Sequence, residues 1–288
     1  MIDAHHHLWD LTAVHYPWLA AKGVSRFFGD PSPIQRNYLL PDFRAEASAL
    51  GITGSVHIQV GAADPLAEAK WVQAVVDANR DWSMVQVVHC DLTAPDLAQQ
   101  LDVFQALPSV RGVRQIVGRA PGEDAQTGTN ALLDDPGFLE GLLLIGERGL
   151  SFDLQLIPEL MEKTARVLGQ APRTNVALCH AGSPHDRSPE GLKAWCQQLR
   201  WLSGLPHVRC KLSGLGMFQH RWTVEDFRPI IETCLDQFGA DRCMFGSNFP
   251  VDSLYSNYET LLRAHERLIP DSQRSQVFAE TAARFYKF

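Results

Sequence analysis

The chain has 288 residues, of which 45% are hydrophobic and 20% charged, and its formal net charge is −7 at pH 7. This is the composition of an ordinary globular protein, and the absence of a basic stripe argues against nucleic-acid binding. No apolar run is long enough to cross a membrane, and the first residues lack the basic and apolar segments of a signal peptide, so we expect a cytoplasmic protein.

The six cysteines are scattered without a CxxC pair, which argues against a zinc ribbon and against a disulfide framework. No low-complexity linker divides the sequence. We therefore expect a single domain over residues 1–288.

Short apolar runs alternate along the chain with amphipathic segments, which predicts strands and helices in turn. The expected strands are, in chain order, 2–7, 54–60, 84–89, 110–116, 151–156, 176–180, 208–212 and 243–246. The expected helices are 41–50, 65–79, 95–106, 135–148, 157–168, 188–202, 224–238 and 255–268.

Eight strands that alternate with eight helices predict a parallel sheet of the α/β class. Several strands are continuously apolar, as strands buried on both faces are. The length suits a single (β/α)8 TIM-type barrel. A doubly wound open sheet is the alternative, but no glycine fingerprint follows the first strand.

The first predicted strand carries the most informative residues, His5 and His7. Alternate side chains of a strand point to one face, so the two imidazoles should project together as metal ligands or as donors to an anionic substrate. A long connection over residues 9–40 follows, with Trp18 among its aromatic residues. At this place in a barrel it should form a wall over the pocket or a strap whose aromatics pack on neighbouring helices.

Polar side chains stand at or near the ends of most of the other strands. They include His57, Gln59, His89, Arg114, Gln115, Asp153, Gln155, His180, Lys211, Asn248 and Asp252. Strand ends meet at one face of a barrel, where active sites lie, so this pattern predicts a polar pocket. Two members also have a structural interpretation, since Lys211 could pair with Asp153 and His89 could be a satisfied core histidine.

Several motifs together resemble the amidohydrolase superfamily. They are HxH in the first strand, CHAG around His180, KLSG around Lys211, GSNFP around Asn248, and the closing AARFY. More narrowly, they are similar to the amidohydrolase-related branch that contains bacterial sugar lactonases and, further away, 2-pyrone-4,6-dicarboxylate lactonase. The resemblance covers nearly the whole chain. It implies a distorted (β/α)8 barrel and hydrolysis at a carbonyl carbon.

With this resemblance, His5, His7 and His180 are candidate ligands of one divalent metal ion, most readily Zn²⁺, and a metal-free site in which they polarise the carbonyl directly stays open. Arg114, Gln115, Trp18, His57 and Lys211 are candidate substrate-binding residues, with Arg114 suited to a carboxylate.

The chain departs from the resembling family at Asn248, where the family has an Asp that acts as base or metal ligand. An amide cannot take a proton at neutral pH. Asp252, four residues further on, is the first candidate for the catalytic base, and His180 is the second. Asn248 should point into the pocket without a charge.

These residues predict a hydrolase that opens a small lactone, such as a sugar-acid lactone, in carbohydrate catabolism. A zinc-dependent non-oxidative decarboxylase and a small-ligand binding protein with a degenerate site are the alternatives. The expected partner is a small-molecule substrate, and a homodimer is possible.

Overall fold

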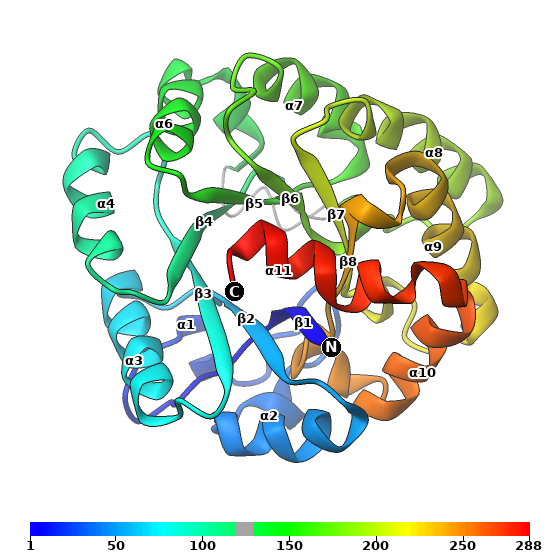
Figure 1. The fold of residues 1–288 in the computed structure, drawn as a ribbon, viewed down its shortest axis with the longest axis horizontal. Coiled ribbons are helices and arrows are strands. Elements are labelled where there is room, and N and C mark those ends of the chain that lie inside the picture. The colour runs from blue at the N-terminus through cyan, green and yellow to red at the C-terminus, as the bar shows by residue number, and fades with distance from the viewer. Residues whose placement is uncertain (119–128) are drawn as a thin grey trace.

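Eight parallel strands follow one another around the centre of the molecule in the order of the sequence (Figure 1). This computed structural model describes residues 1–118 and 129–288. The strands are β1 (Ile2–His6), β2 (Gly54–Ile58), β3 (Ser83–His89), β4 (Val110–Ile116), β5 (Ser151–Gln155), β6 (Val176–Leu178), β7 (Val208–Leu212) and β8 (Cys243–Phe245). Each pairs with the next in parallel register.

The sheet closes where the segment after β8 meets β1. The backbone N–H of Asn248 donates to the carbonyl of His5 at 2.7 Å, and that of His7 donates to the carbonyl of Phe249 at 2.7 Å. The (β/α)8 barrel is therefore confirmed, and the open doubly wound sheet is wrong. Closure also places Asn248 directly beside the two histidines of the first strand.

Helices surround the strands (Figure 1). They are α1 (Pro17–Ala20), α2 (Leu40–Ala47), α3 (Pro65–Ala78), α4 (Leu97–Gln105), α6 (Pro136–Glu147), α7 (Met161–Leu168), α8 (Pro189–Ser203), α9 (Val224–Phe238), α10 (Tyr258–Leu268) and α11 (Thr281–Tyr286). Several begin as their sequence predicts, with a capping side chain before a proline: the carboxylate of Asp64 accepts from two N–H groups of α3. No helix of the described residues is long and apolar enough to cross a membrane.

The barrel interior is filled by a small apolar cluster from facing strands, including Val56, Ile58, Val87 and Met244. Tyr286 of α11 belongs to the same cluster, and α11 lies across one end of the barrel (Figure 1). The C-terminal helix thus covers this end. The long connection and the loops that follow the strands lie at the other end, where the cavity is found.

A bulge in β1 sets the direction of the histidines. Asp3 pairs with Ser55 and His6 with His57, so β1 has one residue more than β2 between these pairs. Such an extra residue changes which side chains face inward. His6 faces outward, where its ring stacks on Phe43 at 4.1 Å between centroids, and His5 and His7 face the barrel mouth.

The long connection after β1 is pinned at both ends by backbone hydrogen bonds between Trp9 and Tyr38. It contains the short helix α1, which the sequence did not predict, and Trp9 and Tyr38 are fully buried. Trp18, Phe27 and Phe28 from this stretch line the cavity. The expected wall over the pocket is therefore confirmed, and other aromatics of the same stretch act as the expected strap.

Candidate active site

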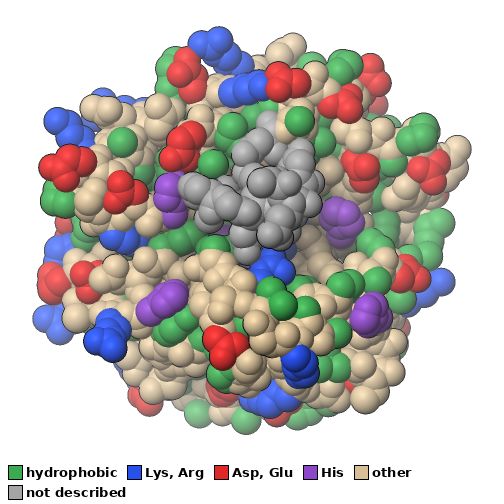
Figure 2. Space-filling model, turned by 180° about the vertical axis from the view of Figure 1, so that it is seen from behind, with side chains coloured by type: hydrophobic (Ala, Val, Ile, Leu, Met, Phe, Trp, Pro, Cys, Tyr) green, Lys and Arg blue, Asp and Glu red, His purple; other side chains and the backbone are tan. Residues whose placement is uncertain are grey.

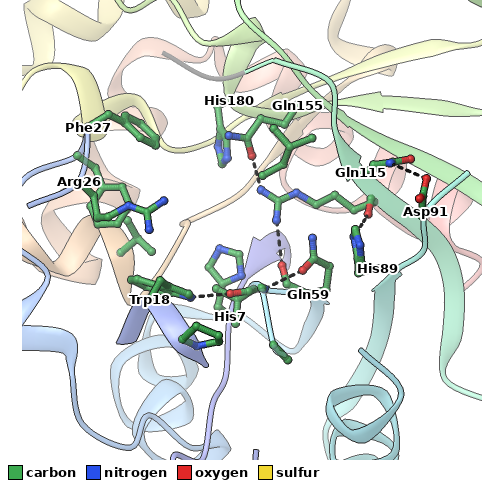
Figure 3. Close-up of a pocket in the computed structure, with 18 of the residues that line it drawn as sticks. His7, Trp18, Arg26, Phe27, Gln59, His89, Asp91, Gln115, Gln155 and His180 are labelled. Carbon is green, nitrogen blue, oxygen red and sulfur yellow. Dashed lines mark hydrogen bonds between the residues drawn. The ribbon is translucent and has the colours of Figure 1, made fainter. Parts of the chain in front are cut away.

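A cavity of about 690 Å³ lies at the mouth of the barrel, opposite α11. Figure 2 shows the face opposite to that of Figure 1, with histidine side chains visible at several places around its centre. In the close-up, Trp18, Arg26 and Phe27 lie on one side and His89, Gln115 and Asp91 on the other, with His7 and His180 between them (Figure 3). The cavity thus combines an aromatic wall with a polar floor.

The structure brings His5, His7 and His180 together from two distant parts of the chain. The ring centroid of His5 lies 5.2 Å from that of His7 and 4.5 Å from that of His180. His7 and His180 line the cavity, and His5 lies beneath them without exposure. Both ring nitrogens of His5 lack a hydrogen-bond partner among the described residues.

All three histidines are neutral at pH 7. Burial is the largest cause: it lowers the pKa of His7 to about 3 and holds those of His5 and His180 well below the usual value, and nearby positive charges act in the same direction. A neutral imidazole carries one N–H and one lone pair. The cluster can therefore both donate and accept a proton.

His180 is presented by an unusual turn of the backbone. His180, Ala181 and Ser183 have φ values of 55°, 51° and 52°, in the left-handed region that side chains disfavour, and Gly182 between them has φ 70°. The indole N–H of Trp195 donates to the carbonyl of Ala181 at 2.8 Å and holds the turn. Because of this turn β6 ends at Leu178, two residues earlier than predicted.

The side chain of His180 is oriented by its neighbours in β7 and the loop after it. Its Nδ1 lies 3.0 Å from the Oγ of Ser213, which leaves Nε2 for a ligand. Gly214 makes this contact possible, since a Cβ at that position would lie 2.4 Å from Nδ1 of His180. Ser213 and Gly214 of the KLSG motif therefore determine where the side chain of His180, in the CHAG motif, lies.

Arg114 lies in the floor of the cavity and is 6% exposed. It donates to the carbonyl of Gln59 at 2.9 Å and to the side-chain oxygen of Gln155, and its Nε has no partner among the described residues. All these acceptors are neutral. A buried guanidinium without a counter-ion creates a binding site for an anionic or strongly polar oxygen.

Two other predicted substrate-binding residues line the cavity. The indole N–H of Trp18 donates to the carbonyl of Val60 at 2.7 Å, which fixes the ring as a wall. Gln115 accepts from the N–H of Leu92 and donates to Asp91, so its side chain is oriented rather than free.

His57 does not line the cavity, and its predicted substrate contact is corrected. Val56 and Ile58 face the barrel interior, so His57 between them faces outward. There its Nδ1 accepts from the N–H of Leu8 at 3.1 Å and its Nε2 lies 3.8 Å from the buried carboxylate of Glu68. His57 supports the barrel wall behind the site.

Lys211 is also absent from the lining. It points into the barrel, but one layer below the cavity, where it pairs with Asp153 and both side chains are fully buried. The hydroxyl of Tyr286 donates to the same carboxylate at 2.8 Å. The structural interpretation of Lys211 is the one that the structure supports.

Asn248 lines the cavity, as predicted, and Asp252 lies behind it. The Nδ2 of Asn248 is 3.4 Å from Oδ1 of Asp252, and its Oδ1 is 3.3 Å from Nε2 of His7. Asp252 is 2% exposed, and burial raises its pKa to about 7 although Asn248 and Arg187 oppose the shift. Asp252 is not among the residues that line the cavity, and its role as the catalytic base stays a prediction.

His5, His7 and His180 are the three residues predicted to ligate one divalent metal ion. Their rings meet edge to face or tilted, and no group of three or more His, Cys, Asp or Glu side chains in residues 1–118 and 129–288 is arranged to hold a metal ion. Nδ1 of His7 is occupied at 2.7 Å by the carbonyl of Ile58, so only Nε2 could bind a metal, and Nε2 faces Asn248. Ligation of an ion by His5, His7 and His180 stays a prediction.

Sequence reasoning did not assign a role to Gln59, Gln155, Arg26 and Phe27, which all line the cavity. Gln59 and Gln155 hold Arg114. Their place at strand ends is the one feature of the sequence that could have identified them as site residues. Arg26 and Phe27 come from the long connection, whose path no local pattern reveals.

The sequence matches the amidohydrolase family over residues 2–288. It is 35% identical to an uncharacterised protein, y4mH, of Sinorhizobium fredii over 100% of this chain and 98% of the relative. It is 29% identical to an L-fucono-1,5-lactonase of Burkholderia multivorans over 99% and 95% of the two chains. The crystal structure of an amidohydrolase from Burkholderia multivorans with bound zinc superposes with a TM-score of 0.83 at 26% identity, covering 100% and 99% of the two chains.

Proposed function

Because the chain belongs to the amidohydrolase family, we propose that it is a hydrolase that opens a small lactone by attack of water on the ring carbonyl. The proposal rests on one observation: neutral His180 and the buried cation Arg114 line the same cavity. The similarity to an L-fucono-1,5-lactonase supports a sugar-acid lactone or a related carboxylated lactone. The role in carbohydrate catabolism, the cytoplasmic location and a homodimer stay predictions.

The cavity residues supply what lactone opening needs. Arg114 binds an oxygen of the substrate, either the ring carbonyl or a carboxylate, through its planar guanidinium. Trp18 and Phe27 cover the apolar face of the ring and reduce the access of bulk water. Gln59 and Gln155 hold Arg114 in place.

His180 is the catalytic base that this arrangement favours. In the tautomer in which Nδ1 carries the proton and donates to Ser213, Nε2 presents a lone pair to the cavity and takes a proton from the attacking water. The oxygen of that water bonds to the carbonyl carbon. The ring C–O bond then breaks, and the proton returns from His180 to the leaving alkoxide, which gives a hydroxy acid.

The test is a panel of sugar lactones, with and without a carboxylate, followed with a pH indicator. We expect at least one to be opened, and His180→Gln to lower kcat by about 10²- to 10⁴-fold, the range for loss of a general base. His185→Gln is the matched control, since His185 pairs with Glu159 at the surface and does not line the cavity.

Two results of the same experiment would contradict the proposal. Release of CO₂ from an aromatic or pyrone acid without lactone opening would identify a decarboxylase. Saturable binding of a lactone without turnover would identify a binding protein.

A further inference from the structure

A second recess of about 410 Å³ lies beside the cavity and shares two lining residues with it. These are Phe27, which Figure 3 shows on one wall of the cavity, and Met217. Because both residues belong to both linings, their side chains form part of the boundary between the two spaces. The other residues that line the recess come from the segments that precede α8 and α9, and they are His185, Phe218, Gln219, His220 and Arg221.

The ring of Phe27 is held at this boundary by other aromatic rings. It stacks on Phe218, with 5.5 Å between the centroids and 24° between the planes. The edge of Phe28 meets it at 5.2 Å. Phe27 comes from the long connection after β1, whereas Phe218 comes from the segment after β7. The contact between the two rings therefore joins two distant segments and covers one face of Phe218.

The turn that carries this ring is fixed by the backbone and by one side chain. The N–H of Arg26 donates to the carbonyl of Gly29 at 2.8 Å, and the N–H of Gly29 donates back at 2.9 Å. The hydroxyl of Tyr255 donates to the carbonyl of Phe28 at 2.6 Å, and its ring stacks on His220 at 3.9 Å. A Cβ at Gly29 would overlap the hydroxyl oxygen of Tyr255, so this contact requires glycine.

We propose that Phe27 is a specificity-determining residue, because its ring takes the place on Phe218 that a bulky substituent of a lactone would otherwise occupy. The enzyme thereby prefers small lactones, and it excludes larger ones by steric conflict rather than by a new attractive contact. Tyr255 is the positioning residue that holds the turn of Phe27 in place. The inference rests on the proposed function and deepens it, since it names the size class of lactone that the same site accepts.

The first test removes the ring in Phe27→Ala. The two spaces then join, and the uncovered face of Phe218 can stack on a phenyl substituent of the substrate. We expect kcat/KM to fall for an unsubstituted sugar lactone and to rise for a lactone with a phenyl substituent, so that their ratio changes by about tenfold or more. Phe288→Ala is the matched control, because Phe288 is not among the residues that line either space.

The second test, Tyr255→Phe, removes one hydroxyl group and keeps the ring that stacks on His220. We expect faster hydrogen–deuterium exchange at the amides of residues 26–29, measured by mass spectrometry without any substrate. For the unsubstituted lactone, KM should rise more than kcat falls, and the preference should move toward the phenyl-substituted lactone. Thermal unfolding verifies that each variant is folded, and Phe27→Leu repeats the first comparison if Phe27→Ala does not fold.

Three results would overturn the inference: a wild type that opens both lactones equally well, an unchanged preference in the folded variant of Phe27, or unchanged exchange in Tyr255→Phe. If the wild type opens no lactone, the proposed function fails and binding decides the inference separately. In that case we expect the phenyl-substituted lactone to bind Phe27→Ala about tenfold more tightly than the wild type, measured by saturation-transfer NMR titration. Equal affinities would overturn the inference.

Discussion

Arg114 determines the kind of substrate that the cavity can accept, because it is a buried cation whose hydrogen bonds go only to neutral groups of the described structure. Its presence in the pocket follows from its place near the end of β4, where the sequence analysis expected it. Arg114 is fixed by the backbone carbonyl of Gln59 and the side-chain oxygen of Gln155, and from the sequence both residues are visible only as polar residues at strand ends. Their partnership with Arg114 depends on three strands meeting in space.

For Arg114→Ala we expect KM for a carboxylated lactone to rise by about 10- to 100-fold, since a charged hydrogen bond is worth roughly 1.5–3 kcal/mol. Steady-state kinetics measure this, and an uncharged lactone should respond less. Arg173→Ala is the control, because Arg173 is exposed and pairs with Glu147. An unchanged KM for every substrate would remove Arg114 from the binding site.

Asp252 should make folding stability depend on pH in a defined direction. Its pKa is about 7 in the folded protein, against about 3.9 for an unfolded Asp. Between these values the folded protein keeps a proton that the unfolded chain releases. The contribution of Asp252 to stability therefore falls as pH rises from about 4 to about 7.

Urea unfolding of wild type and Asp252→Asn across this range tests the prediction. Asn cannot ionise, so the free energy of unfolding of the variant relative to wild type should increase from pH 4 to pH 8. A difference that is the same at every pH would show that Asp252 ionises in the folded protein as it does in the unfolded chain.

At the scale of elements, the turn after β6 and the loop after β7 act as one unit that presents His180. From the sequence the sixth strand is predicted to continue through His180, because an apolar run gives no sign of a left-handed backbone. His57 and Lys211 are likewise predicted from the sequence to lie in the pocket. Strand-end position alone does not distinguish an inward from an outward residue, or the top layer of a barrel from the layer below.

Gly214→Ala should lower activity, because it should displace the side chain of His180. The new Cβ would approach Nδ1 of His180 to 2.4 Å and the Cε of Met217 to 2.6 Å. We expect kcat to fall by about tenfold or more, since a displacement near 1 Å can cost that much or more.

Gly23→Ala is the matched control for Gly214→Ala. Gly23 also has a positive φ, 69°, but a Cβ there meets nothing within 4 Å. Both variants therefore carry the cost of a left-handed alanine, and only one disturbs His180. Equal activity of the two variants would show that Gly214 matters for the backbone alone.

At the scale of the whole molecule, buried contacts that stabilise the fold lie at one end of the barrel and the cavity lies at the other. At one end, α11 inserts Tyr286 against the buried pair of Lys211 and Asp153. At the other end, the loops and the long connection form the cavity (Figure 3). The alternation of apolar runs and amphipathic segments was enough to predict the barrel, because it depends on local pattern. The contact of α11 with Asp153 was not predictable, since Tyr286 and Asp153 lie more than 130 positions apart in the sequence. The short helix α11 itself was not among the predicted helices.

The central claim is that water attacks the ring carbonyl of a lactone in this cavity. The most direct measurement is turnover of the best lactone of the panel in H₂¹⁸O, with the product analysed by mass spectrometry. We predict one ¹⁸O atom in the carboxylate of the hydroxy acid and none in the new hydroxyl group. Label in the hydroxyl group, or no product with any lactone, would contradict the account.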